Sequence, residues 1–325
     1  MENSKQAANP NPTLPINSAK HKLPKPISSA TGLTEKLDTT LRSLRGQYVL
    51  LAFSGGLDST VLLHLLATTR QHYGFQVHAL HVHHGLHIAA DDWAKHCAKI
   101  CLEWSVPLQV VAVEVIDKSG LGLEAAARQA RYAALYRAAK ALSVDWILTA
   151  HHQRDQAETL LLQLMRGAGV KGLAAMASCD SKRSLLRPLL DTPQSQLLNY
   201  ARAHQLVWCD DASNENTYYS RNWVRHTLLP VLLAANSSVL ANMARSATHC
   251  SEASDLLDNL AELDAHLLMT DQQQLKLARL QELSFARAKN VLRWWCGQNG
   301  LLMPSAAVLE EIYQQLMKAK SSTRL

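Results

Sequence analysis

The stretch YVLLAFSGGLDSTVLLHLL, residues 48–66, decides the fold expected for this chain of 325 residues. An apolar run at 48–53 stops at Ser-Gly-Gly-Leu-Asp-Ser, residues 54–59, and apolar residues then return at helical spacing. The pattern predicts a buried strand, a tight glycine turn and an amphipathic helix. The polar residues at the turn mark it as a candidate ligand site.

Strand-like and helical segments alternate over the next hundred residues. Apolar strand-like runs occur at 48–53, 77–82, 108–115 and 145–149, and helical runs occur near 58–71, 89–104, 122–142 and 152–166. Such alternation, with nearly continuous apolar strands, predicts a mostly parallel sheet covered by helices on both faces. Ligands of such sheets bind beyond the carboxyl ends of the strands, which is where the glycine turn lies.

Composition divides the chain into three segments. Residues 1–33 hold five of the ten prolines and few apolar residues, which predicts a disordered tail. Residues 34–230 form the α/β domain, and 231–325 show no strand pattern and predict a small helical domain. In that domain Asn236-Ser237-Ser238 could cap a long helix. Leucines line one face of this helix near its end, namely Leu256, Leu260, Leu263 and Leu267. Two further helices are predicted near 284–296 and 305–319.

The overall composition is that of a globular protein, with 47% apolar and 18% charged residues. No apolar run is long enough to span a membrane, the N-terminus lacks the apolar stretch of a secretory signal, and no membrane partner is expected. The six cysteines are scattered without a CxxC pair, which favours reduced thiols in the cytoplasm. A net charge of +6 mildly favours an anionic partner, with nucleic acid the obvious candidate.

The glycine turn has the chemistry of a phosphate-binding loop. Gly55 and Gly56 allow the positive φ angles and close approach that an anion nest requires, at the positive end of the following helix. Ser54 and Ser59 add hydroxyl donors, but the lysine of a Walker loop is missing. Because Asp58 would repel a phosphate, Mg²⁺ is expected between them. SGGLDS resembles the PP-loop of the ATP pyrophosphatases, which split ATP into AMP and pyrophosphate.

Two histidine-containing segments follow other predicted strands. If the helix after the fourth strand begins near His151, then His151, Asp155 and Glu158 lie along one face close to the glycine turn. The run HALHVHHGLH, residues 78–87, suggests a metal site at first sight, but no cysteine or carboxylate is suitably spaced nearby. The interpretation adopted is that its loop contributes His84 and Gly85 to a nucleotide cleft.

Two arginine pairs are further candidates. Arg128 and Arg131 are neighbours at i, i+3 on a predicted helix, and Arg221 and Arg225 lie four residues apart in another. The second pair could clamp a phosphate or a carboxylate. Spacing alone fits a solvated surface pair equally well in both cases.

Six blocks in this order resemble the tRNA(Ile)-lysidine synthase family. They are SGGLDS (54–59), HVHHGL (81–86), GLEAAARQARY (122–132), TAHHQRDQAETLLLQLMRGAG (149–169), RPLL (187–190) and DDASNENTYYSRNWVR (210–225). The resemblance covers roughly residues 46–320. It implies a Rossmann-like PP-loop domain with a mostly parallel five-stranded sheet, followed by a small all-α domain resembling the family's middle domain.

The resemblance also implies an activity. A member is a ligase that uses ATP and Mg²⁺ to adenylate the 2-carbonyl of the cytidine at the first anticodon position of a CAU-anticodon isoleucine tRNA. Free L-lysine then displaces AMP, which changes codon reading from AUG to AUA and charging from methionine to isoleucine. Deprotonating the lysine amine at pH 7 costs about 4.6 kcal/mol, so a nearby acceptor is needed. A cytoplasmic location and a possible homodimer complete this expectation.

The family pattern assigns roles to residues of this chain. Asp155 and Glu158 would hold the lysine, His151 and Arg131 would lie in the catalytic cleft, and Asp58 would be catalytic and serve the metal. Arg128, Arg221 and Arg225 would contact the RNA or the adenylate. The expected ATP-binding residues are Ser54, Gly55, Gly56, Leu57, Asp58, Ser59, His84 and Gly85.

Two departures from the family pattern are visible. Members often have Asp or Asn where this chain has Arg154, which is interpreted as a change on a neighbouring helix face. Many members also have a further C-terminal domain that grips the tRNA acceptor arm, and the chain ends at Leu325 without it. Reduced or different discrimination against methionine tRNAs is one explanation, and truncation is the other.

Two rival functions remain. A PP-loop tRNA thiolase also adenylates a base but delivers sulfur, usually through paired cysteines, whereas Cys97 and Cys101 form only a CxxxC. The second rival is a non-catalytic, nucleotide-dependent RNA-binding protein, which the intact Asp58, Asp155 and Glu158 oppose. ATP–pyrophosphate exchange would separate that protein from an enzyme.

Overall fold

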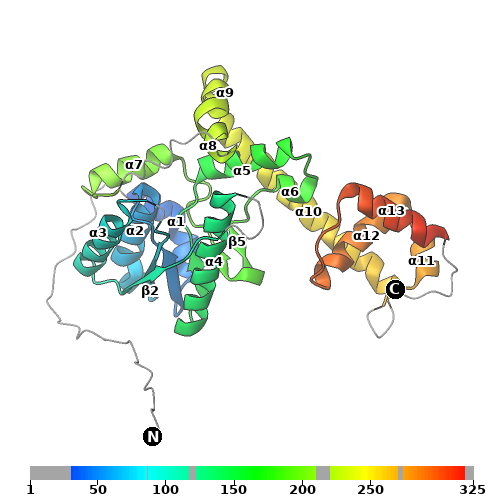
Figure 1. Ribbon diagram of the computed structural model, residues 1–325, viewed down its shortest axis with the longest axis horizontal. Coiled ribbons are helices and arrows are strands. Elements are labelled where there is room, and N and C mark those ends of the chain that lie inside the picture. The colour runs from blue at the N-terminus through cyan, green and yellow to red at the C-terminus, as the bar shows by residue number, and fades with distance from the viewer. Residues whose placement is uncertain (1–30, 86, 117–121, 210–219, 270–273, 319–325) are drawn as a thin grey trace, which may run out of the picture.

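The computed structural model describes residues 31–85, 87–116, 122–209, 220–269 and 274–318. Its α/β part contains a six-stranded sheet in the order β3-β2-β1-β4-β6-β5 (Figure 1). The strands are Tyr48–Ala52 (β1), Gln76–His83 (β2), Leu108–Ala112 (β3), Trp146–Leu148 (β4), Cys179–Asp180 (β5) and Leu185–Leu186 (β6). All pairings are parallel except that of β5 with β6.

The mostly parallel sheet is confirmed, but the expected number of five strands is wrong. The strands β5 and β6 are two residues long and flank a 3₁₀ turn at Ser181–Arg183. Segments this short carry no alternation of apolar and polar residues, so periodicity could not predict them.

Helices cover both faces of the sheet, as predicted. The helices of the α/β part are Thr31–Ser43 (α1), Leu57–Tyr73 (α2), Ala90–Glu103 (α3), Leu123–Leu142 (α4), Gln153–Met165 (α5), Val170–Leu173 (α6) and Gln194–Ala203 (α7). Val49 and Leu51 pack with α1, α2, α3 and α7 on one face, whereas Leu50 packs with α4 on the other. Successive residues of β1 face opposite sides of the sheet, and both sides are buried. This is why the strand is apolar throughout.

The strand order reverses between β1 and its two neighbours. The chain proceeds from β1 outward to β2 and β3, and then returns to add β4 on the opposite side of β1. Such a switch point leaves a crevice at the carboxyl ends of the two central strands, where ligands of this class of sheet bind. The glycine turn follows β1 and the His151 segment follows β4, so both predicted motifs border that crevice.

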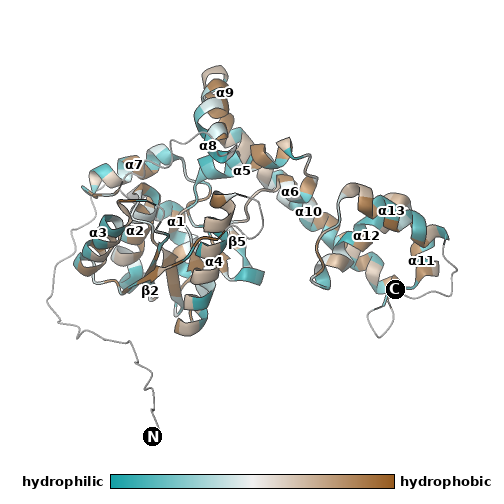
Figure 2. Cartoon of the chain, viewed as in Figure 1, coloured by the Kyte–Doolittle hydropathy of each residue, from teal (hydrophilic) through white to brown (hydrophobic). Residues whose placement is uncertain are grey.

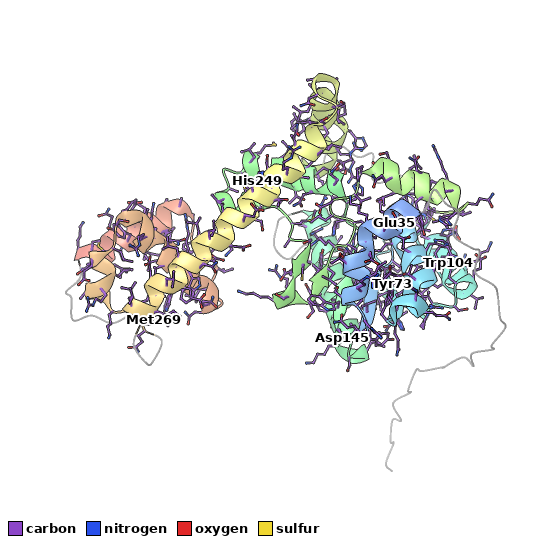
Figure 3. The ribbon with its side chains drawn as sticks, turned by 180° about the vertical axis from the view of Figure 1, so that it is seen from behind. Glu35, Tyr73, Trp104, Asp145, His249 and Met269 are labelled. Atoms are coloured by element: carbon purple, nitrogen blue, oxygen red, sulfur yellow. The ribbon has the colours of Figure 1, made fainter. Side chains whose placement is uncertain are left out.

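The C-terminal part is helical and is joined to the sheet-containing part by one long helix. Its elements are Ser220–Trp223 (α8), a π-helix at Val224–Leu228, Leu229–Ala235 (α9), Val239–Leu268 (α10), Leu277–Glu282 (α11), Phe285–Gln298 (α12) and Ala306–Lys318 (α13). The helix α10 packs against α5 and α6 near its start and against α12 near its end. Figure 3 shows it passing His249 beside the α/β part and ending at Met269 among the C-terminal helices.

The predicted leucine face of α10 exists but does not form its core face. Leu256, Leu263 and Leu267 are 66–76% exposed, and Leu260 is 36% exposed. The buried face instead carries small residues, including Ala244, Ala247, Ala261 and Ala265. Small side chains allow the close approach of neighbouring helices, which hydrophobicity alone did not predict.

The predicted segment boundaries compare with the elements as follows. The helix α1 begins at Thr31, inside the predicted tail 1–33, and the rest of that tail lies outside the described residues. The predicted boundary at 230/231 falls inside α9.

Within the described residues no single helix is long and apolar enough to cross a membrane. One pair of helices, 221–235 and 239–268, has the combined length and composition of a membrane span, but the pair is bent by 102°. Figure 2 shows the hydrophobic residues gathered along strands such as β2.

Candidate active site

The glycine turn forms a compact hydrogen-bonded loop between β1 and α2. Gly55 has φ +84°, a conformation that L side chains rarely adopt, and an added Cβ there would lie 2.9 Å from Cys97 Sγ. The Ser54 and Ser59 hydroxyls lie 3.0 Å apart, and Ser59 donates to the Gly56 carbonyl at 3.1 Å. The helix begins at Leu57 without a side-chain cap, so its first N–H groups remain available to an anion.

Asp58 connects this loop to the segment after β4. Its Oδ2 lies 3.5 Å from His152 Nε2, while its Oδ1 is buried without a hydrogen-bond partner. A buried carboxylate oxygen without a partner fits the hard-cation ligand expected there, so Asp58 could hold Mg²⁺ together with nucleotide phosphates. Within the described residues there is no group of three or more His, Cys, Asp or Glu residues that could hold a metal by itself.

His152, which the sequence analysis did not select, caps the helix α5. Its Nδ1 accepts the Arg154 N–H at 3.1 Å, and its own N–H donates to Asp155 Oδ2 at 3.0 Å. This reciprocal pair is a capping box, with histidine in the place usually taken by serine or threonine. Because Nδ1 accepts, the ring proton is on Nε2, facing Asp58 and Asp155. Histidine is not among the usual N-cap residues, so the sequence held no signal for this role.

The expected helix start near His151 is wrong, because α5 begins at Gln153 and His151 precedes it. His151 therefore does not share a helical face with Asp155 and Glu158. Its Nδ1 instead lies 2.8 Å from Thr149 Oγ1. Burial, followed by the positive charges of Arg128, Arg221 and Arg187, lowers the pKa of His151 to about 3, although nearby Asp155 acts in the opposite direction. A neutral imidazole can donate one hydrogen bond and accept another without carrying charge.

Asp155 and Glu158 form a buried acidic pair that is matched by two arginines. Arg221 donates from Nε to Glu158 Oε2 at 2.8 Å and from Nη2 to Asp155 Oδ1 at 3.0 Å. Arg225 donates from Nε to Glu158 Oε1 at 2.7 Å and from Nη2 to Glu158 Oε2 at 3.0 Å. Burial acts to raise the pKa of Asp155, but the cationic neighbours outweigh it, so that this pKa lies below its usual range. Asp155 is therefore a carboxylate.

Arg154 belongs to this cluster, which corrects the interpretation that it occupies a neighbouring helix face. Its Nε lies 3.7 Å from Glu158 Oε1, one helical turn away, and its Nη2 donates to the Arg225 carbonyl at 2.9 Å. The pKa of Arg154 is lowered by burial, despite the opposing effect of Glu158. Three arginines thus surround two carboxylates, which makes the cluster net positive.

Arg131 and Arg128 lie on α4 near the carboxyl edge of the sheet. Arg131 Nε donates to His84 Nε2 at 3.4 Å, which brings a predicted catalytic residue to a predicted nucleotide-binding one. Burial first, and Arg131 second, lower the pKa of His84 to about 4, and its buried Nδ1 has no hydrogen-bond partner. Arg128 is exposed and lies over the Tyr132 ring at 5.0 Å.

The structure thus brings most of the predicted residues to one crevice. The Ser54–Ser59 loop, His151, Asp155 and Glu158 meet across the β1/β4 switch point, and Arg131 joins them through His84 at the end of β2. Arg221 and Arg225 meet the acidic pair rather than open surface. Leu86 of the predicted HVHHGL block and the segment 210–219 lie outside the described residues.

Two domain families match this chain. Residues 30–232 match the family described as PP-loop domain, and residues 275–325 match the one described as TilS substrate binding domain.

Named relatives cover most of this chain. A tRNA(Ile)-lysidine synthase of Nitrosomonas europaea is 40% identical over 300 residues, which cover 89% of this chain and 64% of the relative. A protein of the same name from Pseudomonas fluorescens is 46% identical over 255 residues, covering 75% of this chain and 57% of the relative. The chain therefore spans about three fifths of the length of the curated relatives it matches.

Solved structures add a comparison of the fold. The U34-tRNA thiolase NcsA from Methanococcus maripaludis, solved with its [4Fe-4S] cluster, superposes with a TM-score of 0.60 at 17% identity. The superposition covers 69% of this chain and 79% of the thiolase. At that identity the likeness shows a similarity of fold alone.

Proposed function

The chain belongs to the PP-loop family and is homologous to tRNA(Ile)-lysidine synthases over most of its length, and from that premise we propose that it makes lysidine. The reaction joins L-lysine to C2 of the cytidine at the first anticodon position of a CAU-anticodon isoleucine tRNA. The observation that carries the proposal is the buried pair Asp155 and Glu158, linked through His152 to Asp58 of the phosphate loop.

In the first step the cytidine O2 attacks the α-phosphate of ATP, and pyrophosphate leaves. The loop from Ser54 to Ser59 would hold the departing pyrophosphate, using the free N–H groups at the start of α2 and the serine hydroxyls. Mg²⁺, when bound, would neutralise phosphate charge beside Asp58. His84 offers an N–H from Nδ1, because its Nε2 accepts from Arg131.

In the second step the lysine Nζ attacks C2, and the C2–O bond breaks to release AMP with that oxygen. The attacking amine must lose a proton, and carboxylates at Asp155 and Glu158 would attract its ammonium form and accept hydrogen bonds from it, while neutral His151 can hydrogen-bond to a substrate without adding positive charge. The target base lies in the single-stranded anticodon loop, so it can turn outward into the crevice.

Lysine can bind only if the arginines move, since Arg221 and Arg225 occupy both carboxylates. We infer that they are placeholders, which keep the acidic pair neutralised until the lysine ammonium replaces one of them. A released guanidinium would then be free to hold an RNA or adenylate phosphate, the role expected from the sequence. This exchange keeps the number of unpaired buried charges low at each stage.

The thiolase alternative has less support. Cys97 and Cys101 are buried, and burial raises the pKa of each thiol, that of Cys101 to about 12. Thiols of this kind are poor nucleophiles.

The test is direct. The protein is incubated with Mg-ATP, L-lysine and a CAU-anticodon isoleucine tRNA transcript, and the digested nucleosides are weighed. A cytidine heavier by one lysine, absent with Asp58→Ala, is the expected result. AMP release without a lysine adduct would contradict lysidine formation by this chain. A parallel reaction with a methionine tRNA transcript of the same anticodon measures discrimination.

A further inference from the structure

Arg187 is a buried cation that the proposed mechanism does not use. It directly follows β6 and is 8% exposed. Its Nη1 donates to the Ala177 carbonyl at 2.6 Å, but its buried Nε has no hydrogen-bond partner among the described residues. No carboxylate among the residues that the structure describes forms an ion pair with it. An isolated buried charge costs several kcal/mol, so a residue of this kind requires an anion.

The sheet register places Arg187 at the crevice. Ile147 and Leu185 are paired across β4 and β6, and both pack in the cluster beneath α4. Thr149 and Arg187 lie two residues further along the two strands, so they stand on the same face at the carboxyl edge. The Thr149 N–H donates to the Leu186 carbonyl at 3.0 Å, which extends the pairing to this level.

Other polar and positively charged groups lie near Arg187 at this edge. Thr149 Oγ1 lies 2.8 Å from His151 Nδ1, so Arg187 adjoins the pair formed by these residues. The first half of α4, which covers this face, carries Arg128. The charges of Arg128 and Arg187 are both near enough to lower the pKa of His151, after the larger effect of burial. The guanidinium groups of Arg128 and Arg187 are thus both within electrostatic reach of His151.

We propose that Arg187 is the buried cation of a phosphate-binding site formed with Arg128 and His151, and that a substrate phosphate occupies it. The site lies beyond β6, two strands from the loop after β1, so it is separate from the pyrophosphate site. The phosphate comes either from the nucleotide, as its α-phosphate, or from the RNA backbone next to the modified cytidine. The identity of the substrate rests on the proposed function, whereas the anion site does not.

The test compares Arg187→Gln with Arg187→Lys and with the matched control Arg183→Gln, whose side chain is 70% exposed on the neighbouring turn. Calorimetry measures the binding of AMP and of a CAU anticodon stem-loop RNA, each without lysine or turnover. Arg187→Gln should weaken one of the two about tenfold or more, and Arg183→Gln neither. Loss of AMP binding identifies the nucleotide as the source. Loss of RNA binding, with the slope of log K against log salt reduced by about 1, identifies the backbone.

Two controls keep the outcome decisive. If Arg187→Gln does not fold, Arg187→Lys keeps the charge without the two-pronged geometry, and it should still lose most of the rise in melting temperature that the bound ligand gives. Unchanged affinity for AMP and for the RNA in a folded Arg187 variant would refute the phosphate site. The role of Arg187 would then be structural, through its hydrogen bond to the Ala177 carbonyl. A protein that loses binding through Arg187 but makes no lysidine would refute the proposed function and keep the site.

Discussion

Asp155 is a residue with two separate tasks. One carboxylate oxygen accepts the His152 N–H at the start of α5, and the other accepts from Arg221. An amide of the same shape could keep the first contact, because its oxygen still accepts a hydrogen bond. Only the second contact, and any attraction for a lysine ammonium, requires the negative charge.

Asp155→Asn should therefore abolish lysine transfer while ATP binding survives. We expect kcat/KM for lysine to fall about 100-fold or more, since a buried charge pair is lost. Varying the lysine concentration in the assay gives kcat/KM for lysine, and calorimetry gives the affinity for ATP. Asp191→Asn, an exposed position, serves as the control. Wild-type lysine affinity in Asp155→Asn would remove this residue from the lysine site.

His151 should make the protein less stable in mild acid. Its pKa of about 3 lies below the unfolded value of 6.5, so between these values only the unfolded chain binds the proton. Stability consequently rises with pH across this window and falls on acidification. Going from pH 7 to pH 5 should cost wild type up to about 2 kcal/mol that His151→Asn does not lose. Urea denaturation at both pH values measures the difference, with His249→Asn as the exposed control.

At the scale of elements, α5 positions the segment that closes the crevice. Glu158 is fully buried in α5 and binds Arg221 of α8 and Arg225 of the π-helix. Val224, between these arginines, packs with Leu161 of α5. Apolar packing and charge pairing therefore both hold α8 and the π-helix against α5. Removing the charge of Glu158 alone should weaken this attachment.

Glu158→Gln should release residues 220–228 from α5. Two half-buried guanidinium groups would share one remaining carboxylate, at a cost of about 3 kcal/mol to the packing of 220–228 against α5. Hydrogen exchange should show faster exchange in 220–228 and little change in the central strand β1. Glu262→Gln, at an exposed position of α10, is the control. Equal protection of 220–228 in both variants would show that the apolar contacts suffice.

On the scale of the whole molecule, α10 is the connection between the two parts. Figure 1 shows it running from the α/β part to the C-terminal helices. It is 30 residues long, and most of its buried residues are alanines. Ala247 is fully buried in the half of α10 that packs against α5 and α6. A larger side chain there would force the helices apart.

Ala247→Leu should destabilise the protein by about 1–3 kcal/mol through overpacking. Leu256→Ala, at a position 69% exposed on the same helix, should change stability by less than about 0.5 kcal/mol. Thermal unfolding of both variants makes the comparison. A larger loss in Leu256→Ala would mean that the leucine face is covered in solution.

The sequence by itself determined the local features of this protein. The apolar run of β1, the positive φ required at Gly55 and the periodicity of α2 follow from neighbouring residues, so the phosphate loop could be found directly. The parallel sheet also followed, because strands buried on both faces are apolar throughout. The short strands β5 and β6 and the role of His152 could not be found, since they depend on contacts with segments elsewhere.

Only the tertiary structure decided which charges meet. Arg221 and Arg225 are more than sixty residues from Asp155 and Glu158 in the chain, and their spacing fitted a surface pair equally well. In the sequence Arg187 was only one member of a short block, yet it is buried at the carboxyl edge of the sheet and forms no ion pair with any carboxylate that the structure describes. The physical reason is that the energy of a charge depends on burial and on neighbours, and both are set by the packing of distant elements.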